Sequence, residues 1–190
     1  MSDLEVILFF GMHGSGKTTV GERLAQEIPG YVHWSSGETI RSVDVANLSS
    51  DLAKEIVHYR FTEEYLPDKY MLQLLQEDLN DSSLTYILDG IPANTNQLLF
   101  IQNNFLIRKN FFFDVDEDVA VERLLKRASR KTDSTREAIN NRNKPYFEET
   151  LPALTSIPHT RINANLSERE VYEQVIASLY SSSVNLLSSK

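Results

Sequence analysis

Short apolar runs alternate with amphipathic stretches along most of the chain. The runs are rich in β-branched and aromatic residues and are bounded by turn residues, which is typical of buried strands. They predict strands at Glu5–Phe10, Tyr31–Trp34, Leu84–Leu88, Asn110–Val115 and Thr160–Asn163. Apolar residues at intervals of three and four predict helices at Thr18–Glu27, Pro67–Asn80, Glu117–Arg127, Thr135–Leu151 and Ser167–Leu179. This alternation indicates an α/β protein with a five-stranded parallel sheet flanked by helices.

Composition and charge narrow the classes of function. The chain has 190 residues, enough for one domain with a small insertion. Its formal net charge of −8 argues against nucleic acid as a partner, because a polymer of phosphates requires an extensive basic surface. The absence of cysteine excludes disulfides, zinc–thiolate sites and a cysteine nucleophile. The N-terminus lacks a basic signal region and the first apolar run is too short to span a membrane, so we expect a cytoplasmic monomer.

The most specific motif follows the first predicted strand. It is a complete G-x-x-x-x-G-K-[ST] phosphate-binding loop, Gly11-Met12-His13-Gly14-Ser15-Gly16-Lys17-Thr18. In such a loop the backbone N–H groups face a polyphosphate, the lysine reaches the β- and γ-phosphates, and the hydroxyl can coordinate Mg²⁺. A helix N-terminus adds partial positive charge beneath the anion. The predicted ATP-binding residues here are Gly11, Gly14, Ser15, Gly16, Lys17, Thr18 and Thr19.

Two further strands end in residues suited to phosphate chemistry. After the second strand, Ser36 and its neighbouring glycine could approach a ligand closely, and Arg41 could grip a phosphate one helical turn later. An ordinary helix N-cap with a solvated arginine would explain this segment equally well. After the third strand, Asp89 is a candidate to hold Mg²⁺ together with Thr18. An acidic turn residue is the alternative reading of Asp89.

A concentration of cations marks the second half of this acidic chain. Arg123, Lys126 and Arg127 share one face of a predicted helix, and Arg142 lies on the next helix. Such a cluster suggests a lid over the phosphates of ATP, although charge runs are often solvated faces.

Taken in this order, the motifs resemble the short-lid adenylate kinase family of nucleoside monophosphate kinases. The family patterns are matched by Ser35–Arg41 (S-T-G-[DE]-x-x-R), Glu64–Asp68 (G-x-L-V-P-[DE]), Asp89–Gln97 (D-G-[FY]-P-R-x-x-x-Q) and Arg142–Tyr146 (R-x-x-x-Y). The resemblance implies a P-loop NTPase fold in a single domain. Its core would comprise residues 1–35, 81–127 and 136–190, with an acceptor-binding helical insertion at about 36–80 and a short lid at about 128–135.

The resemblance also implies the activity and the roles of individual residues. The activity would be transfer of the γ-phosphoryl group from MgATP to a nucleoside monophosphate, AMP in particular. The implied catalytic cations are Lys17, Arg41, Arg127 and Arg142, and Arg123 would lie against the ATP adenine. The implied acceptor site comprises Ser36, Arg41, Leu66, Gly90 and Gln97, with Gln97 reading an adenine edge. His13 is interpreted as a variable position of the loop.

The chain departs from the family pattern at Ala93 and, in the lid, at Lys131 and Ser134, and the departure at Ala93 leaves alternatives open. Ala93 occupies the position of the arginine that would grip the acceptor phosphate. Either Arg60 or Arg108 substitutes for it, or the acceptor differs, or the protein is a weak kinase that chiefly binds nucleotide. The alternative classes are a small-molecule kinase of the shikimate or gluconate type and a non-catalytic nucleotide-binding protein. The chain has neither the Asp-x-Asp after the second strand nor the Gly-Gly-Gly run that the former would need.

Overall fold

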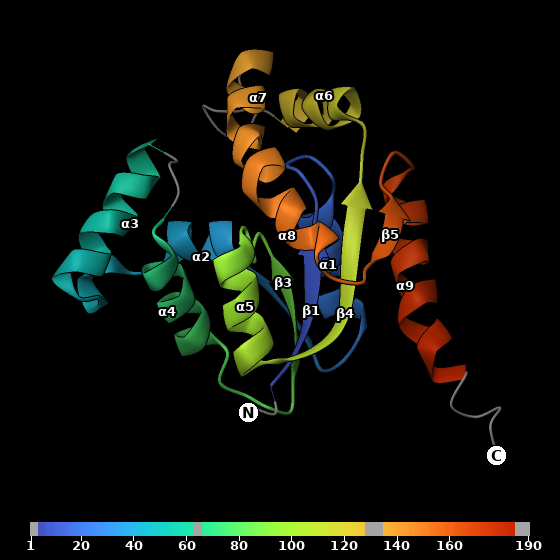
Figure 1. Cartoon of the computed structure of the whole chain (residues 1–190), viewed down its shortest axis with the longest axis horizontal. Coiled ribbons are helices and arrows are strands. Elements are labelled where there is room, and N and C mark those ends of the chain that lie inside the picture. The colour runs from blue at the N-terminus through green and yellow to red at the C-terminus, as the bar shows by residue number, and fades with distance from the viewer. Residues whose placement is uncertain (1–3, 63–65, 128–134, 185–190) are drawn as a thin grey trace.

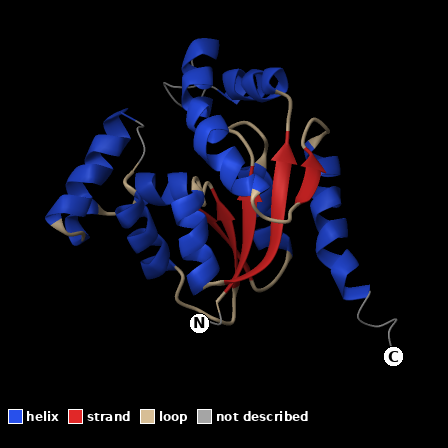
Figure 2. Ribbon diagram, in the orientation of Figure 1, coloured by secondary structure: helices blue, strands red, loops and turns tan. Residues whose placement is uncertain are grey.

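A five-stranded parallel sheet forms the centre of the molecule (Figures 1 and 2). The computed structural model describes residues 4–62, 66–127 and 135–184. The strands are β1 (Glu5–Phe10), β2 (Tyr31–Ser35), β3 (Thr85–Asp89), β4 (Leu106–Asp114) and β5 (Thr160–Asn163), and their order in the sheet is β2-β3-β1-β4-β5. Because every pair is parallel, the carboxyl ends of all five strands meet at one edge.

Helices cover both faces of this sheet. The helices are α1 (Lys17–Glu27), α2 (Ser36–Ser42), α3 (Ser50–Thr62), α4 (Asp68–Asp78), α5 (Thr95–Asn104), α6 (Glu117–Arg127), α7 (Arg136–Pro145), α8 (Leu151–Thr155) and α9 (Glu168–Val184). The short turns η1 (Val45–Asn47) and η3 (Tyr146–Thr150) complete the described helical structure, and η3 is a π-helical turn between α7 and α8. In the part of the chain that the structure describes, no helix combines the length and the apolar character needed to cross a membrane.

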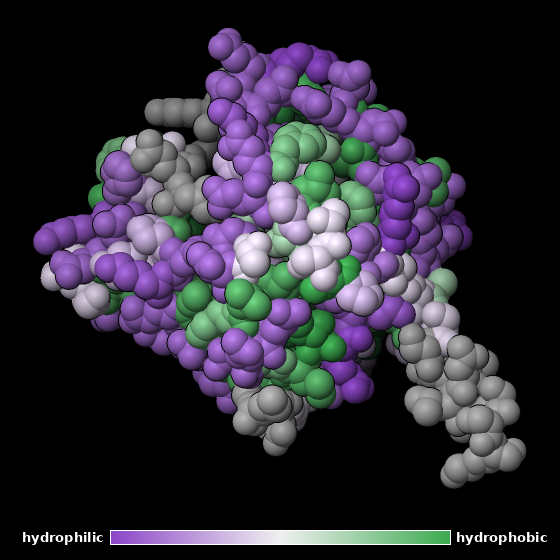
Figure 3. Space-filling view, viewed as in Figure 1, coloured by the Kyte–Doolittle hydropathy of each residue, from purple (hydrophilic) through white to green (hydrophobic). Residues whose placement is uncertain are grey.

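The central strand divides the core in two. Val6, Leu8 and Phe10 of β1 point to the layer formed with α4, α5 and α8. Ile7 and Phe9 point to the opposite layer, formed with α1 and α9. This alternation is the two-residue period of a strand buried on both faces, which explains why β1 is an unbroken apolar run. On the outside, Figure 3 shows mostly hydrophilic residues, with apolar residues gathered over α5.

The α/β class and the five parallel strands are confirmed, with differences in extent. β4 begins at Leu106, four residues before its predicted start at Asn110, because its first residues pair with β1 across a register shift at Val6. The predicted helix Thr135–Leu151 is longer and runs without a break from Arg136 through η3 to Thr155. Three helices, α2, α3 and α5, have no counterpart among the helices predicted individually.

Candidate active site

The phosphate-binding loop connects β1 to α1 at the carboxyl edge of the sheet. Its glycines, Gly11, Gly14 and Gly16, all have positive φ, so the loop takes a backbone path that other residues rarely adopt. The ammonium of Lys17 lies inside the loop, where Nζ donates to Gly11 O at 2.6 Å and Met12 O at 3.0 Å. Burial lowers the pKa of Lys17, and the nearby Arg142 lowers it further, while the charge of Asp89 opposes both. The loop thus holds a cation where a polyphosphate would bind.

Thr18 and Asp89 form the second part of the site. The Thr18 hydroxyl donates to Asp89 Oδ2 at 2.6 Å, which joins the start of α1 to the end of β3. Asp89 is 4% exposed. Burial raises the pKa of its carboxyl, but His33, Lys17 and the Thr18 hydroxyl together outweigh burial and hold that pKa below its ordinary value. A carboxylate that stays ionised beside a hydroxyl is a hard oxygen donor pair, which fits Mg²⁺.

Arg142 reaches the phosphate-binding loop from α7. Its Nη2 lies 3.4 Å from Nδ1 of His13, and its charge is close enough to act on Lys17. The next residue, Asn143, is 1% exposed and accepts a hydrogen bond at Oδ1 from the His13 N–H at 3.1 Å. The predicted Arg142 therefore lies at the loop, and Asn143, which the sequence did not single out, positions it there. The contact with Asn143 uses the His13 backbone, whereas the contact with Arg142 uses its ring. The interpretation of His13 as a variable position stays a prediction.

The other predicted cations lie on α6. Arg127 is the exposed last residue of this helix. Arg123 donates from Nη1 to Ala164 O at 2.7 Å and from Nη2 to Leu166 O at 3.0 Å, which fixes its guanidinium to the loop between β5 and α9. Its contact with adenine stays a prediction. Residues 128–134 of the predicted lid lie outside the described residues, and only Thr135 is described, as the N-cap of α7.

Ser36 and Gly90, two residues of the predicted acceptor site, lie against each other. A Cβ at Gly90, where φ is +81°, would come within 2.3 Å of Ser36 Oγ, so only glycine permits this approach of β3's end to α2. Arg41 is exposed on the last turn of α2, and its guanidinium lies back over Gly37. Leu66 is 4% exposed, and its neighbours 63–65 lie outside the described residues. Ser36 and Gly90 are thus brought together, and Arg41 lies on the helix that begins at Ser36. Their roles at an acceptor stay predictions.

Gln97 lies in a buried polar network. Its Oε1 accepts from the Ala93 N–H at 2.8 Å, and its Nε2 donates to Asp68 Oδ1 at 2.7 Å. Asn94 joins the network, since its Nδ2 donates to the same oxygen at 3.0 Å. Both ends of the Gln97 amide are therefore engaged, and reading a base would require release from Asp68. Its role at the acceptor base stays a prediction.

Ala93 is buried, and both its backbone N–H and its backbone carbonyl are hydrogen-bonded to side chains. It is 6% exposed, and besides the bond to Gln97 its carbonyl accepts from Thr150 Oγ1 at 2.7 Å. Thr150 ends the π-helical turn η3, so the helical segment that carries Arg142 also holds the loop after β3. Within the described residues, no cation bonds to Ala93.

Neither suggested substitute for the missing arginine lies beside Ala93. The alternative in which Arg108 substitutes is excluded: Arg108 is the third residue of β4 and contacts Glu5 at 3.2 Å, which places it at the amino edge of the sheet, opposite the site. Arg60 donates from Nε to Ile40 O at 2.8 Å and from Nη2 to Val43 O at 2.5 Å. Its guanidinium therefore bonds to the carbonyl groups at the C-terminal end of α2 and does not reach Ala93.

Comparison with known proteins agrees with the geometry of this site. A family model described as an AAA domain matches residues 10–140. Over 155 residues the chain is 34% identical to adenylate kinase 1 of Synechocystis sp., covering 78% of this chain and 80% of the relative. It is 30% identical to the adenylate kinase of Synechococcus sp. (strain RCC307), covering 91% and 97% respectively. It is 27% identical to the uridylate kinase of Saccharomyces cerevisiae, covering 90% and 89%.

The loop, the strand order and the acidic end of β3 define the class as a phosphate-loop phosphotransferase that uses ATP. Within this class the chain belongs to the adenylate kinase family. Its function is therefore of the nucleoside monophosphate kinase type.

Proposed function

We propose that the protein transfers the γ-phosphoryl group of MgATP to a nucleoside monophosphate, with AMP as the preferred acceptor. The observation that carries this proposal is the meeting of the phosphate-binding loop, the Thr18–Asp89 pair and Arg142 at one edge of the sheet. Thr18 and Asp89 would hold Mg²⁺, which neutralises charge on the phosphates when bound. Lys17 and Arg142 supply fixed positive charge beside them. We also propose that the protein acts as a monomer in the cytoplasm.

The chemistry needs no general base. A phosphate monoester has a second pKa near about 6, so the attacking oxygen of the acceptor is largely ionised at neutral pH. Catalysis then depends on positioning and on neutralising charge in the transition state. The site offers cations and backbone donors of this kind. We propose that residues 36–80 hold the acceptor and that residues 128–135 close over ATP.

Three observations favour AMP as the acceptor. Ser36 retains a hydroxyl, directly against Gly90, where AMP-selective members of the family carry threonine. Gln97 is present at the family position for reading adenine, although it is bonded to Asp68 here. Two of the relatives are adenylate kinases. The match to a uridylate kinase makes UMP the acceptor to compare with it.

A screen of acceptors tests the proposal. With MgATP held constant, kcat/KM is to be measured by a coupled assay for AMP, UMP, CMP and GMP. We expect the highest value for AMP. A higher value for UMP or CMP would overturn the assignment of AMP and leave phosphotransfer intact. ATP binding without turnover on any of the four would overturn the proposed reaction.

The burial of Ala93 favours a second candidate function, that of a weak kinase that chiefly binds nucleotide. Since no described cation replaces the missing arginine, the acceptor phosphate lacks one bidentate partner. We expect Ala93→Arg to raise kcat/KM for AMP about tenfold or more, because about 1.4 kcal/mol of transition-state stabilisation is a factor of ten. The gain is measured by steady-state kinetics on AMP.

Ala93→Gln is the matched control for this gain. Glutamine adds length and hydrogen-bonding capacity without charge, so it should not reproduce the effect of arginine. Thermal unfolding of both variants checks that the buried position accepts a longer side chain. An unchanged kcat/KM in a folded Ala93→Arg variant would show that the acceptor phosphate is already fully neutralised.

A further inference from the structure

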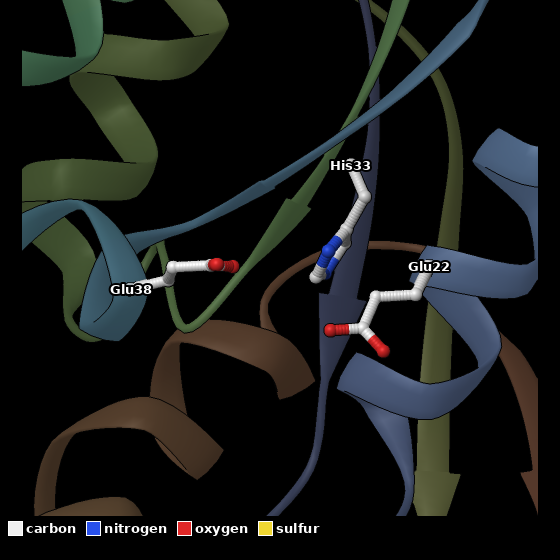
Figure 4. A group of neighbouring side chains, drawn as sticks. All are labelled: Glu22, His33 and Glu38. Carbon is white, nitrogen blue, oxygen red and sulfur yellow. The ribbon is translucent and has the colours of Figure 1, made fainter. Parts of the chain in front are cut away.

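Three side chains from three elements converge beside the phosphate-binding loop. Glu22 comes from α1, His33 from β2 and Glu38 from α2. One ligand atom of each lies within 4.8 Å of the other two. Figure 4 shows both carboxylates pointing toward the imidazole. None of these residues belongs to the machinery assigned above to ATP or to the acceptor.

The His33 side chain is buried, at 5% exposed, and its Nε2 atom makes no hydrogen bond within the described residues. Asp89 Oδ2 lies 3.5 Å from Nε2 and already accepts the Thr18 hydroxyl at 2.6 Å. Buried polar groups are nearly always satisfied, and a buried group without a partner points to an ion or ligand. The unsatisfied Nε2 of His33 therefore points to a bound ion or ligand without any appeal to the two glutamates.

The fold holds this ring in place. Gly21 lies directly against it, and a Cβ at this position would come within 2.3 Å of His33 Cδ2 and 2.8 Å of Nε2. The missing side chain thus lets α1 approach β2 closely and brings Glu22 beside the ring. Asp89, on the adjacent strand, places a further carboxylate oxygen 3.5 Å from Nε2.

The donor set selects the kind of cation. One imidazole and two carboxylates suit a borderline ion such as Zn²⁺, whereas Mg²⁺ prefers oxygen alone. Zinc binds such donors at about 2.0–2.2 Å, so the carboxylates must move inward by rotation of their side chains. Glu22 and Glu38 are both exposed, which permits this movement and gives an ion access from solvent.

We propose that Glu22, His33 and Glu38 bind one Zn²⁺ ion at a site separate from the Mg²⁺ that accompanies ATP. The ion satisfies the buried imidazole and ties α2, which carries Ser36 and Arg41, to α1, which follows the phosphate-binding loop. The site is independent of the acceptor, and it binds the metal without nucleotide.

Calorimetric titration with Zn²⁺ tests the site in chelator-treated, nucleotide-free protein. We expect one Zn²⁺ per chain, no displacement by millimolar Mg²⁺, and a higher unfolding temperature with Zn²⁺ because the metal binds the folded state. His33→Gln and Glu38→Gln should each weaken Zn²⁺ binding at least tenfold. Glu38 is exposed, so its substitution tests the site even if the buried His33 variant fails to fold. His159→Gln, which changes an exposed histidine elsewhere, should leave Zn²⁺ binding unchanged.

Two results would overturn the proposal. One is the absence of saturable Zn²⁺ binding by the wild-type protein. The other is Zn²⁺ binding that persists unchanged in Glu38→Gln and in a folded His33→Gln variant, which would place the ion elsewhere. Both results would leave the phosphotransfer proposal untouched, because no nucleotide enters this experiment.

Discussion

Replacement of Lys17 by alanine is expected to lower kcat by about 10²–10³, the effect typical of removing one preorganised donor to developing charge. In the structure the Lys17 ammonium lies within the curve of the loop, bonded to Gly11 O and Met12 O. It is thus already in position to meet the β- and γ-phosphates. Calorimetric titration with MgATP should also show weaker binding, and coupled-assay kinetics give the loss in kcat.

Lys54→Ala is the control for this prediction. Lys54 is also a lysine, but its side chain is 77% exposed on α3 and lies 3.9 Å from Asp51. Its removal should leave kcat and ATP affinity within a factor of about two, as for most surface substitutions. Unchanged ATP affinity and unchanged turnover in Lys17→Ala would contradict the assignment of the loop.

Arg142→Ala is expected to lower kcat by about 10²–10³ while changing the KM for ATP much less. Arg142 already lies at the loop beside His13. Its guanidinium presents several N–H donors, which suit a phosphoryl group that carries most charge in the transition state. Arg127→Ala should show the same division between kcat and KM, because Arg127 would reach the phosphates only on closure. Steady-state kinetics with ATP varied at saturating acceptor measure both parameters.

Lys144→Ala serves as the control on the same helix. Lys144 is 69% exposed and faces Glu148 at 3.6 Å, so it carries similar charge without reaching the loop. Its loss should change neither parameter appreciably. A rise in KM alone in Arg142→Ala would mean that this arginine binds ground-state ATP and adds nothing specific to the transition state.

The parts of the site that depend on local spacing could be predicted from the sequence. A phosphate-binding loop has a fixed length between strand and helix, so residues 11–18 identify it without coordinates. Asp89 follows an apolar strand, and parallel strands bring their carboxyl ends together. Even the exclusion of Arg108 follows from strand direction, since it lies near the amino end of β4 whereas Ala93 follows the carboxyl end of β3.

The parts that depend on packing between distant segments could not be predicted. Asn143 acts by meeting a backbone N–H in the loop, and nothing near it in the sequence marks that contact. His33 is one polar residue in a short strand, and its burial depends on Gly21 of α1. α5 escaped prediction because its buried face includes the polar Gln97, and α3 because only Leu52 and Ile56 on it are buried.

The unbroken helical segment from Arg136 to Thr155 has a mechanical consequence. Near its middle, Asn143 is bonded to the loop that receives ATP, and two turns later Thr150 is bonded to Ala93 on the acceptor side. Because one helical segment bears both contacts, a tilt at one contact displaces the other. In the reaction proposed above, the segment would act as a lever between the two halves of the site, and closure over the phosphoryl donor would reach the loop beside the acceptor.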